Sequence, residues 1–246
     1  MLTEHVGWRG VLAALGVVTA LMFVLALLLI PETLPLAQRH DGGLRRALSN
    51  FARLGRDRAF ILLTIMVACN FGALLAYISA APFVGQVMLG MSPAQFSLSF
   101  ASGAVAMVLT NFINSRMAGR VPPTRLLFVG TTLVGLAGCA FATLALTEAL
   151  SIPAFIACAF VMSGGVALVS ANGTALALGL ADYARGSGSA LLGCIQFLGG
   201  SLTPPIVGAW GDHTAVPMAT TIIVGAVCAC ACAVGAATVL RRRARG

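Results

Sequence analysis

The chain has 246 residues, of which 59% are hydrophobic and 9% charged, and its mean hydropathy is +0.98. A soluble fold of this length cannot bury so much apolar surface, so the composition excludes a soluble globular domain and indicates an integral membrane protein. The formal net charge is +8, with arginine as the only strongly basic residue type. Membrane topology explains this charge better than nucleic-acid binding does, because no soluble domain is left to present a basic face.

Seven apolar stretches are long enough to cross a membrane. A helical span needs about 20 apolar residues to cross a hydrocarbon core of about 30 Å. The stretches lack the alternation of barrel strands, and each helix satisfies its own backbone in lipid. The sequence therefore predicts an all-α integral membrane protein with transmembrane helices near residues 10–30, 59–84, 94–115, 126–147, 153–180, 187–208 and 216–240. A signal peptide is the alternative for the first stretch, but no small-residue cleavage site precedes Pro31.

The longest hydrophilic stretch follows the first helix and divides the chain into one helix before it and six after it. Within it, Leu44, Leu48, Phe51 and Leu54 recur at helical spacing among arginines. This pattern predicts an amphipathic helix along the cytoplasmic membrane surface. The expected organisation is a first helix at 1–31, a cytoplasmic loop at 32–58, a six-helix bundle at 59–240 and a basic cytoplasmic tail at 241–246.

The distribution of arginine predicts the orientation of the helices. Fourteen of the fifteen arginines fall on one side of the predicted spans, and Arg9 alone falls on the other. Loops rich in Lys and Arg stay in the cytoplasm, so we expect the amino terminus to face outward. Contact between the arginine-rich side and anionic lipid head groups is a further expectation.

The sequence offers no constellation typical of a metal, cofactor or catalytic site. Seven cysteines lie within or beside the apolar helices, where they serve as small packing residues. The run "CACAC" at 228–232 places its cysteines two residues apart, and such positions do not share a helix face. His5, His40 and His213 are scattered over loops and tails, and no Ser/His/Asp, Cys/His or paired-carboxylate set lies at a membrane face. We therefore expect no cofactor, no metal and no enzymatic activity.

The amide side chains show a repeated order. Outside the loop they belong to the second, third, fifth and sixth predicted helices or their flanks, at Asn70, Gln86, Gln95, Asn111, Asn114, Asn172 and Gln196. The second to fourth helices and the fifth to seventh helices thus form two three-helix units, each with two amide-bearing helices followed by one without amides, and the two units start on opposite sides of the membrane. Secondary transporters contain such inverted repeats, and their substrate sites lie near the midplane of the membrane. Interhelical hydrogen bonds are the favoured interpretation for Asn111, Asn114 and Asn172. For Asn70 and Gln196, which lie near mid-depth, a hydrogen bond and a substrate contact are both open.

Several blocks in order resemble one family. The sequence contains "GWRG" before a helix that ends in "PETLP", followed by "YISAAPFV", "NSRMAGR" and "GSGSALLGCIQFLGG". These blocks resemble the carboxy-terminal half of the Bcr/CflA drug-resistance transporters of the major facilitator superfamily. The resemblance implies a twelve-helix fold, of which this chain supplies helix six and the second six-helix bundle. "IPETLP" at 30–35 is then the exit of helix six into the central loop.

The same resemblance implies multidrug efflux across the bacterial inner membrane by proton-coupled alternating access, with this chain an incomplete part of the transporter. The implied partners are a small drug-like molecule, protons, membrane lipid, and the missing amino-terminal bundle or a second copy; no nucleic acid is implied. All seven acidic residues are assigned to loops or ends: Glu4, Glu148 and Asp212 outside, and Glu32, Asp41, Asp57 and Asp182 in the cytoplasm. We therefore expect the proton-coupling carboxylate in the absent half. The alternative is a non-transporting remnant, or a seven-helix sensor or scaffold.

The candidate substrate-binding residues are aromatic and polar side chains of the predicted helices. Aromatic rings contact varied apolar compounds, whereas amides and hydroxyls offer adaptable hydrogen bonds. For Phe71 and Phe197, core packing or contact with lipid is the alternative. The candidates are Asn70, Phe71, Tyr77, Ser102, Gln196 and Phe197. In addition, Pro82, Pro204 and Pro205 are expected to break or kink their helices.

Overall fold

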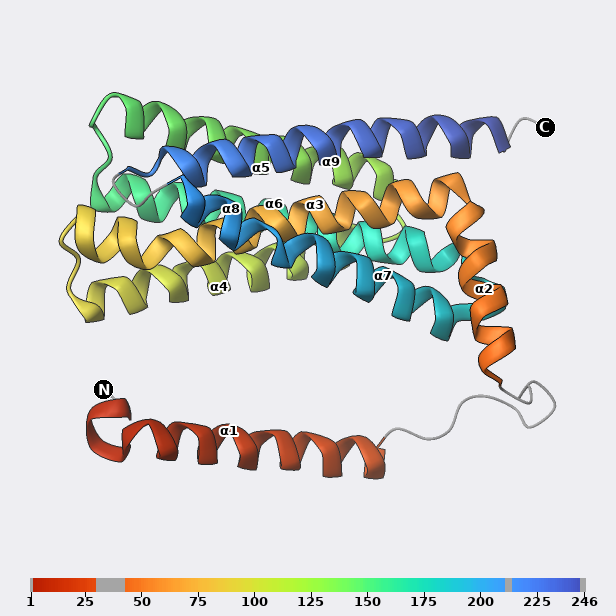
Figure 1. Ribbon diagram of the computed structural model, residues 1–246, viewed down its shortest axis with the longest axis horizontal. Coiled ribbons are helices and arrows are strands. Elements are labelled where there is room, and N and C mark those ends of the chain that lie inside the picture. Colours follow the sequence, from red (N-terminus) through yellow and green to blue (C-terminus); the bar gives the residue numbers. More distant parts are fainter. Residues whose placement is uncertain (1, 30–42, 211–213, 244–246) are drawn as a thin grey trace. The chain divides into compact units, whose positions relative to one another are not determined.

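The computed structural model describes residues 2–29, 43–210 and 214–243, and these contain helices but no β-strand (Figure 1). Seven spans within them are long and apolar enough to cross a membrane, which confirms the predicted all-α membrane fold. The α-helices are α1 (Leu2–Leu29), α2 (Leu44–Arg56), α3 (Arg58–Pro82), α4 (Pro93–Met117), α5 (Pro123–Leu146), α6 (Ile152–Gly179), α7 (Arg185–Ser201), α8 (Thr203–Ala209) and α9 (Val216–Arg243). A π-helix, η2 (Phe83–Met88), and a 3-10 turn, η3 (Asp182–Ala184), complete the described elements.

The chain forms two compact units, Met1–Leu44 and Arg45–Gly246. The first contains α1, whose apolar span runs from Gly7 to Leu29. Gly7 has φ 64° and interrupts the helical path. Glycine adopts this left-handed conformation without the steric penalty that a side chain brings.

The second unit is a helical bundle built around α3. This helix packs against α6, α7, α8 and α9, while α5 packs against α6 and α9, and α4 lies along α6. The arginine-rich end of the bundle is the end where α3 begins at Arg58 and α9 ends at Arg243. One apolar cluster, which includes Tyr77, Phe141 and Met218, occupies the opposite half of the bundle. A second, which includes Leu54 and Phe60, lies at the arginine-rich end. The two clusters form the core that positions the candidate site.

Helices α5 and α6 approach each other closely at two glycines. A Cβ atom added to Gly165 would lie 2.8 Å from the carbonyl oxygen of Gly130, and one added to Gly130 would lie 2.9 Å from that of Gly165. The two backbones therefore touch at a point where neither residue has room for a side chain. Small residues permit such contacts, which drive helix association in lipid.

A helix break precedes Pro204 and Pro205 as expected, whereas at Pro82 the helix changes from α to π without ending. Pro82 is the last residue of α3, and the chain continues directly into the π-helix Phe83–Met88. Between α7 and α8 the helix breaks at Leu202, followed by Pro204 and Pro205. Proline lacks the backbone N–H that a continuous helix requires, so the break follows from the sequence.

Asp57 joins the start of α3 to the end of α9. Its Oδ1 accepts hydrogen bonds from the backbone amides of Ala59 (2.9 Å) and Phe60 (3.2 Å) and thereby caps α3. The Arg243 guanidinium donates to both carboxylate oxygens, at 2.9 and 3.0 Å. Partial burial acts to raise the pKa of Asp57, but the Arg243 guanidinium and the two amides outweigh burial and hold the pKa below its usual value.

Removal of the Asp57 carboxylate is expected to destabilise the bundle in a pH-dependent way. Because the folded-state pKa is depressed, the contribution is fully present above about pH 4 and is lost as the pH falls through the folded-state value. Asp57→Ala should lower the unfolding free energy at pH 7 by about 1 kcal/mol through the lost cap alone. Asp57→Asn keeps the helix cap but removes the ion pair, so its loss of unfolding free energy should equal that of Arg243→Gln. Thermal unfolding in detergent at pH 7 and pH 3 measures this, and a wild-type profile for Asp57→Ala would refute it.

Candidate functional site

Two of the candidate aromatic residues meet where α3 contacts α7. The rings of Phe71 and Phe197 lie edge to face, with their centroids 5.2 Å apart and an interplanar angle of 74°. Phe71 is half-buried because its ring lies over Gly200, where an added Cβ would be 2.6 Å from the Phe71 Cδ1 atom. Phe197 is 65% exposed, and its sequence neighbour Gln196 is half-buried. An exposed aromatic ring is thus held against a second, half-buried ring.

Asn70 is directed into the bundle. It is 2% exposed, and its Nδ2 donates to the Val166 carbonyl and to the Ser170 Oγ of α6, each at 3.2 Å. Asn70 therefore forms an interhelical hydrogen bond, which is one of the two roles that the sequence left open for it, the other being a substrate contact. Such bonds tie neighbouring helices together in lipid.

A second pair of amides links α4 to α6. The Asn172 Nδ2 donates to the Asn114 Oδ1 and to the Leu168 carbonyl, both at 2.9 Å. The expected interhelical hydrogen bond is confirmed for Asn114 and Asn172. Asn111, one turn earlier on α4, is exposed.

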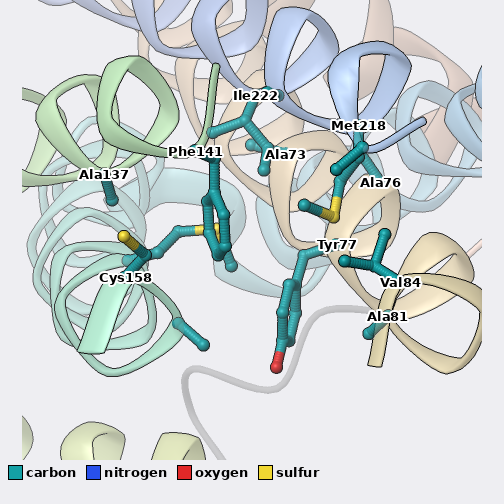
Figure 2. Packing of buried hydrophobic residues seen from close by; sticks show 14 of the residues in the cluster. Ala73, Ala76, Tyr77, Ala81, Val84, Ala137, Phe141, Cys158, Met218 and Ile222 are labelled. Atoms are coloured by element: carbon teal, nitrogen blue, oxygen red, sulfur yellow. The ribbon is translucent and has the colours of Figure 1, made fainter. Parts of the chain in front are cut away.

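Tyr77 lies at the centre of an aromatic cluster. It is 4% exposed, and its ring centroid lies 5.7 Å from that of Phe100, 6.4 Å from that of Phe141 and 5.9 Å from that of Phe155. Figure 2 shows Tyr77 and Phe141 in one cluster with Met218 of α9. Because these rings come from α3, α4, α5 and α6, Tyr77 holds four helices together and lies apart from the Phe71–Phe197 pair.

Ser102 also satisfies its hydroxyl within the bundle. The side chain is half-buried, and its Oγ donates to the Ser99 carbonyl of the same helix at 2.7 Å. Of the six candidates, the structure brings Phe71 and Phe197 into contact, and half-buried Gln196 precedes Phe197 on α7. It uses Asn70, Tyr77 and Ser102 in packing and hydrogen bonds inside the bundle.

Sequence reasoning missed an apolar groove of about 650 Å³ between α3, α7, α8 and α9. Small residues on α3, α7 and α9 create it, and their spacing of three or four residues is the signal that could have indicated it. None of the six candidates lines this groove. Its lining includes Ala68, Gly72, Ala73, Gly199, Gly225 and Cys228.

Comparison with known families identifies the chain. The family model described as the Major Facilitator Superfamily matches residues 1–204 and 69–246. The chain belongs to the major facilitator superfamily. As a major facilitator chain it is a multi-pass membrane protein.

Two bacterial relatives of this major facilitator chain cover most of its length. It is 29% identical over 227 residues to an uncharacterized MFS-type transporter YdgK of Bacillus subtilis, an alignment of 92% of this chain and 56% of the relative. It is 26% identical over 215 residues to a bicyclomycin resistance protein homolog of Haemophilus influenzae, covering 87% of this chain and 54% of the relative. The chain spans about half the length of the curated relatives it matches.

The acidic side chains that the structure describes in this major facilitator chain lie at helix ends. Asp57 caps α3, Glu148 is exposed in the α5–α6 turn, and Asp182 forms an exposed ion pair with Arg185 at 2.7 Å. None of these three carboxylates is placed to change ionisation at the middle of the membrane. Among the described residues, no group of three or more His, Cys, Asp or Glu side chains could hold a metal ion.

Proposed function

We propose that this chain is the carboxy-terminal part of a Bcr/CflA-type multidrug exporter that works in the bacterial inner membrane by proton-coupled alternating access. The observation that carries the proposal is the exposed aromatic ring of Phe197, packed on Phe71 in a chain of the major facilitator superfamily. The similarity to a protein named as a bicyclomycin resistance homolog supports a drug-like substrate.

The proposed substrate contacts follow from the exposed and fixed surfaces of α3 and α7. The free face of Phe197 accepts apolar and aromatic parts of a molecule, and the Gln196 amide both donates and accepts hydrogen bonds. Phe71 supports the Phe197 ring from behind because Gly200 leaves space for it. In this proposal Asn70, Tyr77 and Ser102 act behind the contact surface by fixing α3 and α4.

A second bundle completes the proposed transporter. The chain spans about half of its relatives, so we propose that the six helices from Arg58 to Arg243 rock against an amino-terminal bundle, or against a second copy. The described carboxylates lie at helix ends, which supports a proton-coupling group in that other bundle. The predicted topology places the arginine-rich ends in the cytoplasm.

Truncation of the exposed ring is expected to weaken export. In cells that express the gene with its upstream sequence, Phe197→Ala should reduce export of bicyclomycin or ethidium by about threefold to tenfold, since an aromatic contact contributes about 0.5–1.5 kcal/mol beyond its area. Leu136→Ala is the matched control, because Leu136 is a 60% exposed apolar residue on α5. The measurement is intracellular accumulation at equal expression. Equal effects of the two variants would overturn the proposed site, and no export by a well-inserted wild-type protein would favour the sensor or scaffold alternative.

A further inference from the structure

All the charged side chains of α2 lie on one side of the helix. At 100° per residue, Arg45, Arg46, Arg53 and Arg56 fall within a sector of about 100°. Leu48, Phe51 and Leu54 occupy the opposite side, and α2 contains no acidic residue. A short helix with cationic side chains on one face and large apolar side chains on the other is typical of helices that lie in a membrane interface.

The second half of α2 is attached to the bundle. Leu54 is 1% exposed and packs in the cluster that contains Phe60. The Arg53 guanidinium lies 4.1 Å from the centroid of the Tyr183 ring, which belongs to the turn between α6 and α7. These two contacts fix the position of α2 at the arginine-rich end, where Figure 1 shows it running steeply across the direction of the long helices.

In the first half of α2, the apolar side chain of Leu48 is uncovered. Leu48 lies on the same apolar side as Leu54 but is 56% exposed, whereas Leu54 is buried. The transmembrane part of α3 begins at Arg58, two residues after α2 ends, so α2 lies at the level of the membrane surface. At that level an uncovered apolar side chain is able to enter the boundary between head groups and acyl chains.

The neighbouring carboxylate does not neutralise the arginines of α2. Asp57 follows Arg56 directly, but its two oxygens are engaged by Arg243 and by the first amides of α3. Arg45, Arg46 and Arg56 are exposed. A cluster of this kind beside a transmembrane helix attracts anionic phospholipids.

We propose that α2 is a docking surface for the phosphate groups of anionic phospholipids. Arg45, Arg46 and Arg56 contact the phosphates while Leu48 enters the acyl boundary. Because Leu54 and Asp57 connect α2 to the core and to α9, bound lipid holds the α2–α3 corner against the bundle. This surface is independent of the substrate path, so its test does not depend on transport.

Hydrogen exchange of the full chain in nanodiscs tests the surface. The probe lipids are phosphatidylcholine alone and phosphatidylcholine with phosphatidylglycerol, and the readout is the exchange rate of amides 45–50. In the wild type these amides should exchange at least about fivefold more slowly with phosphatidylglycerol, since each arginine at an anionic surface contributes about that factor. Arg45→Gln with Arg46→Gln should abolish most of the difference, and raised salt should reduce it.

The control is Arg120→Gln with Arg125→Gln, which removes the same charge from exposed arginines at the corner between α4 and α5, at the same end of the bundle. This variant should keep the lipid dependence of amides 45–50. Unchanged exchange in α3 and α9 shows that both variants are folded. Equal exchange rates of amides 45–50 in the two lipid compositions would overturn the proposal. Protection that depends on protein concentration and not on the lipid would also overturn it, because it would indicate that a second copy of the chain binds α2.

Discussion

Tyr77→Ala is expected to lower the free energy of unfolding of the bundle by about 3–5 kcal/mol, the range for deletion of a large buried aromatic side chain. The ring is 4% exposed and lies within 6.4 Å, centroid to centroid, of the rings of Phe100, Phe141 and Phe155. Its loss removes contacts to three other helices at once and leaves a cavity between them. Unfolding of the purified chain by SDS titration in mixed micelles measures the effect.

Tyr77→Phe is the matched control for the aromatic cluster. It keeps the ring and removes only the hydroxyl, so we expect a change of at most about 1 kcal/mol. If Tyr77→Ala left stability unchanged but abolished drug binding, Tyr77 would belong to the substrate path and its proposed role in packing would be refuted.

Gly165→Ala is expected to cost about 1–3 kcal/mol, the range for overpacking a tight core. The added Cβ would lie 2.8 Å from the Gly130 carbonyl oxygen, 2.9 Å from a methyl of Val134 and 3.0 Å from the Leu133 Cβ. The Gly130 oxygen is backbone and cannot rotate away, so α5 and α6 must separate. The same SDS titration measures the loss.

Gly193→Ala provides the comparison on α7. No atom lies within 4 Å of an added Cβ at Gly193. Alanine there should be neutral or should stabilise the helix by up to about 1 kcal/mol. Similar losses at both positions would show that helix propensity, rather than the α5–α6 contact, determines the effect.

The sequence was sufficient to predict the helices because lipid requires each span to be long and apolar. The second predicted helix, at 59–84, corresponds to Arg58–Pro82 together with the first residues of the π-helix Phe83–Met88. Hydropathy does not distinguish a π-turn from an α-turn, so the π-helical geometry and its continuation past residue 84 to Met88 were not predicted.

The faces of the helices were harder to predict than their bounds. In a membrane bundle both the core side and the lipid side of a helix are apolar, so the periodicity that orients a soluble helix is weak. Tyr77 and Phe71 lie six residues apart on α3, yet one is buried among four helices and the other packs on exposed Phe197. Only the packing partners reveal this difference.

The amides carried more information about the helix faces. The hydrogen bond between Asn114 and Asn172 was predictable because an amide in lipid needs a partner.

The contacts at the arginine-rich end join residues far apart in the sequence. Asp57 and Arg243 are separated by 186 positions, and neither composition nor spacing pairs them. By contrast, the amphipathic pattern of α2 was visible, because an arginine-rich helix at a membrane surface keeps the strong periodicity that the spans lack.

The most direct test of the account is drug accumulation in cells with and without the gene, taken with its upstream sequence. We predict that deletion raises the intracellular level of bicyclomycin or ethidium, and that a protonophore raises the level in gene-bearing cells to that of the deletion strain. Equal accumulation of both compounds in the two strains, with the protein correctly inserted in the membrane, would contradict the proposal that this chain is part of a proton-coupled drug exporter.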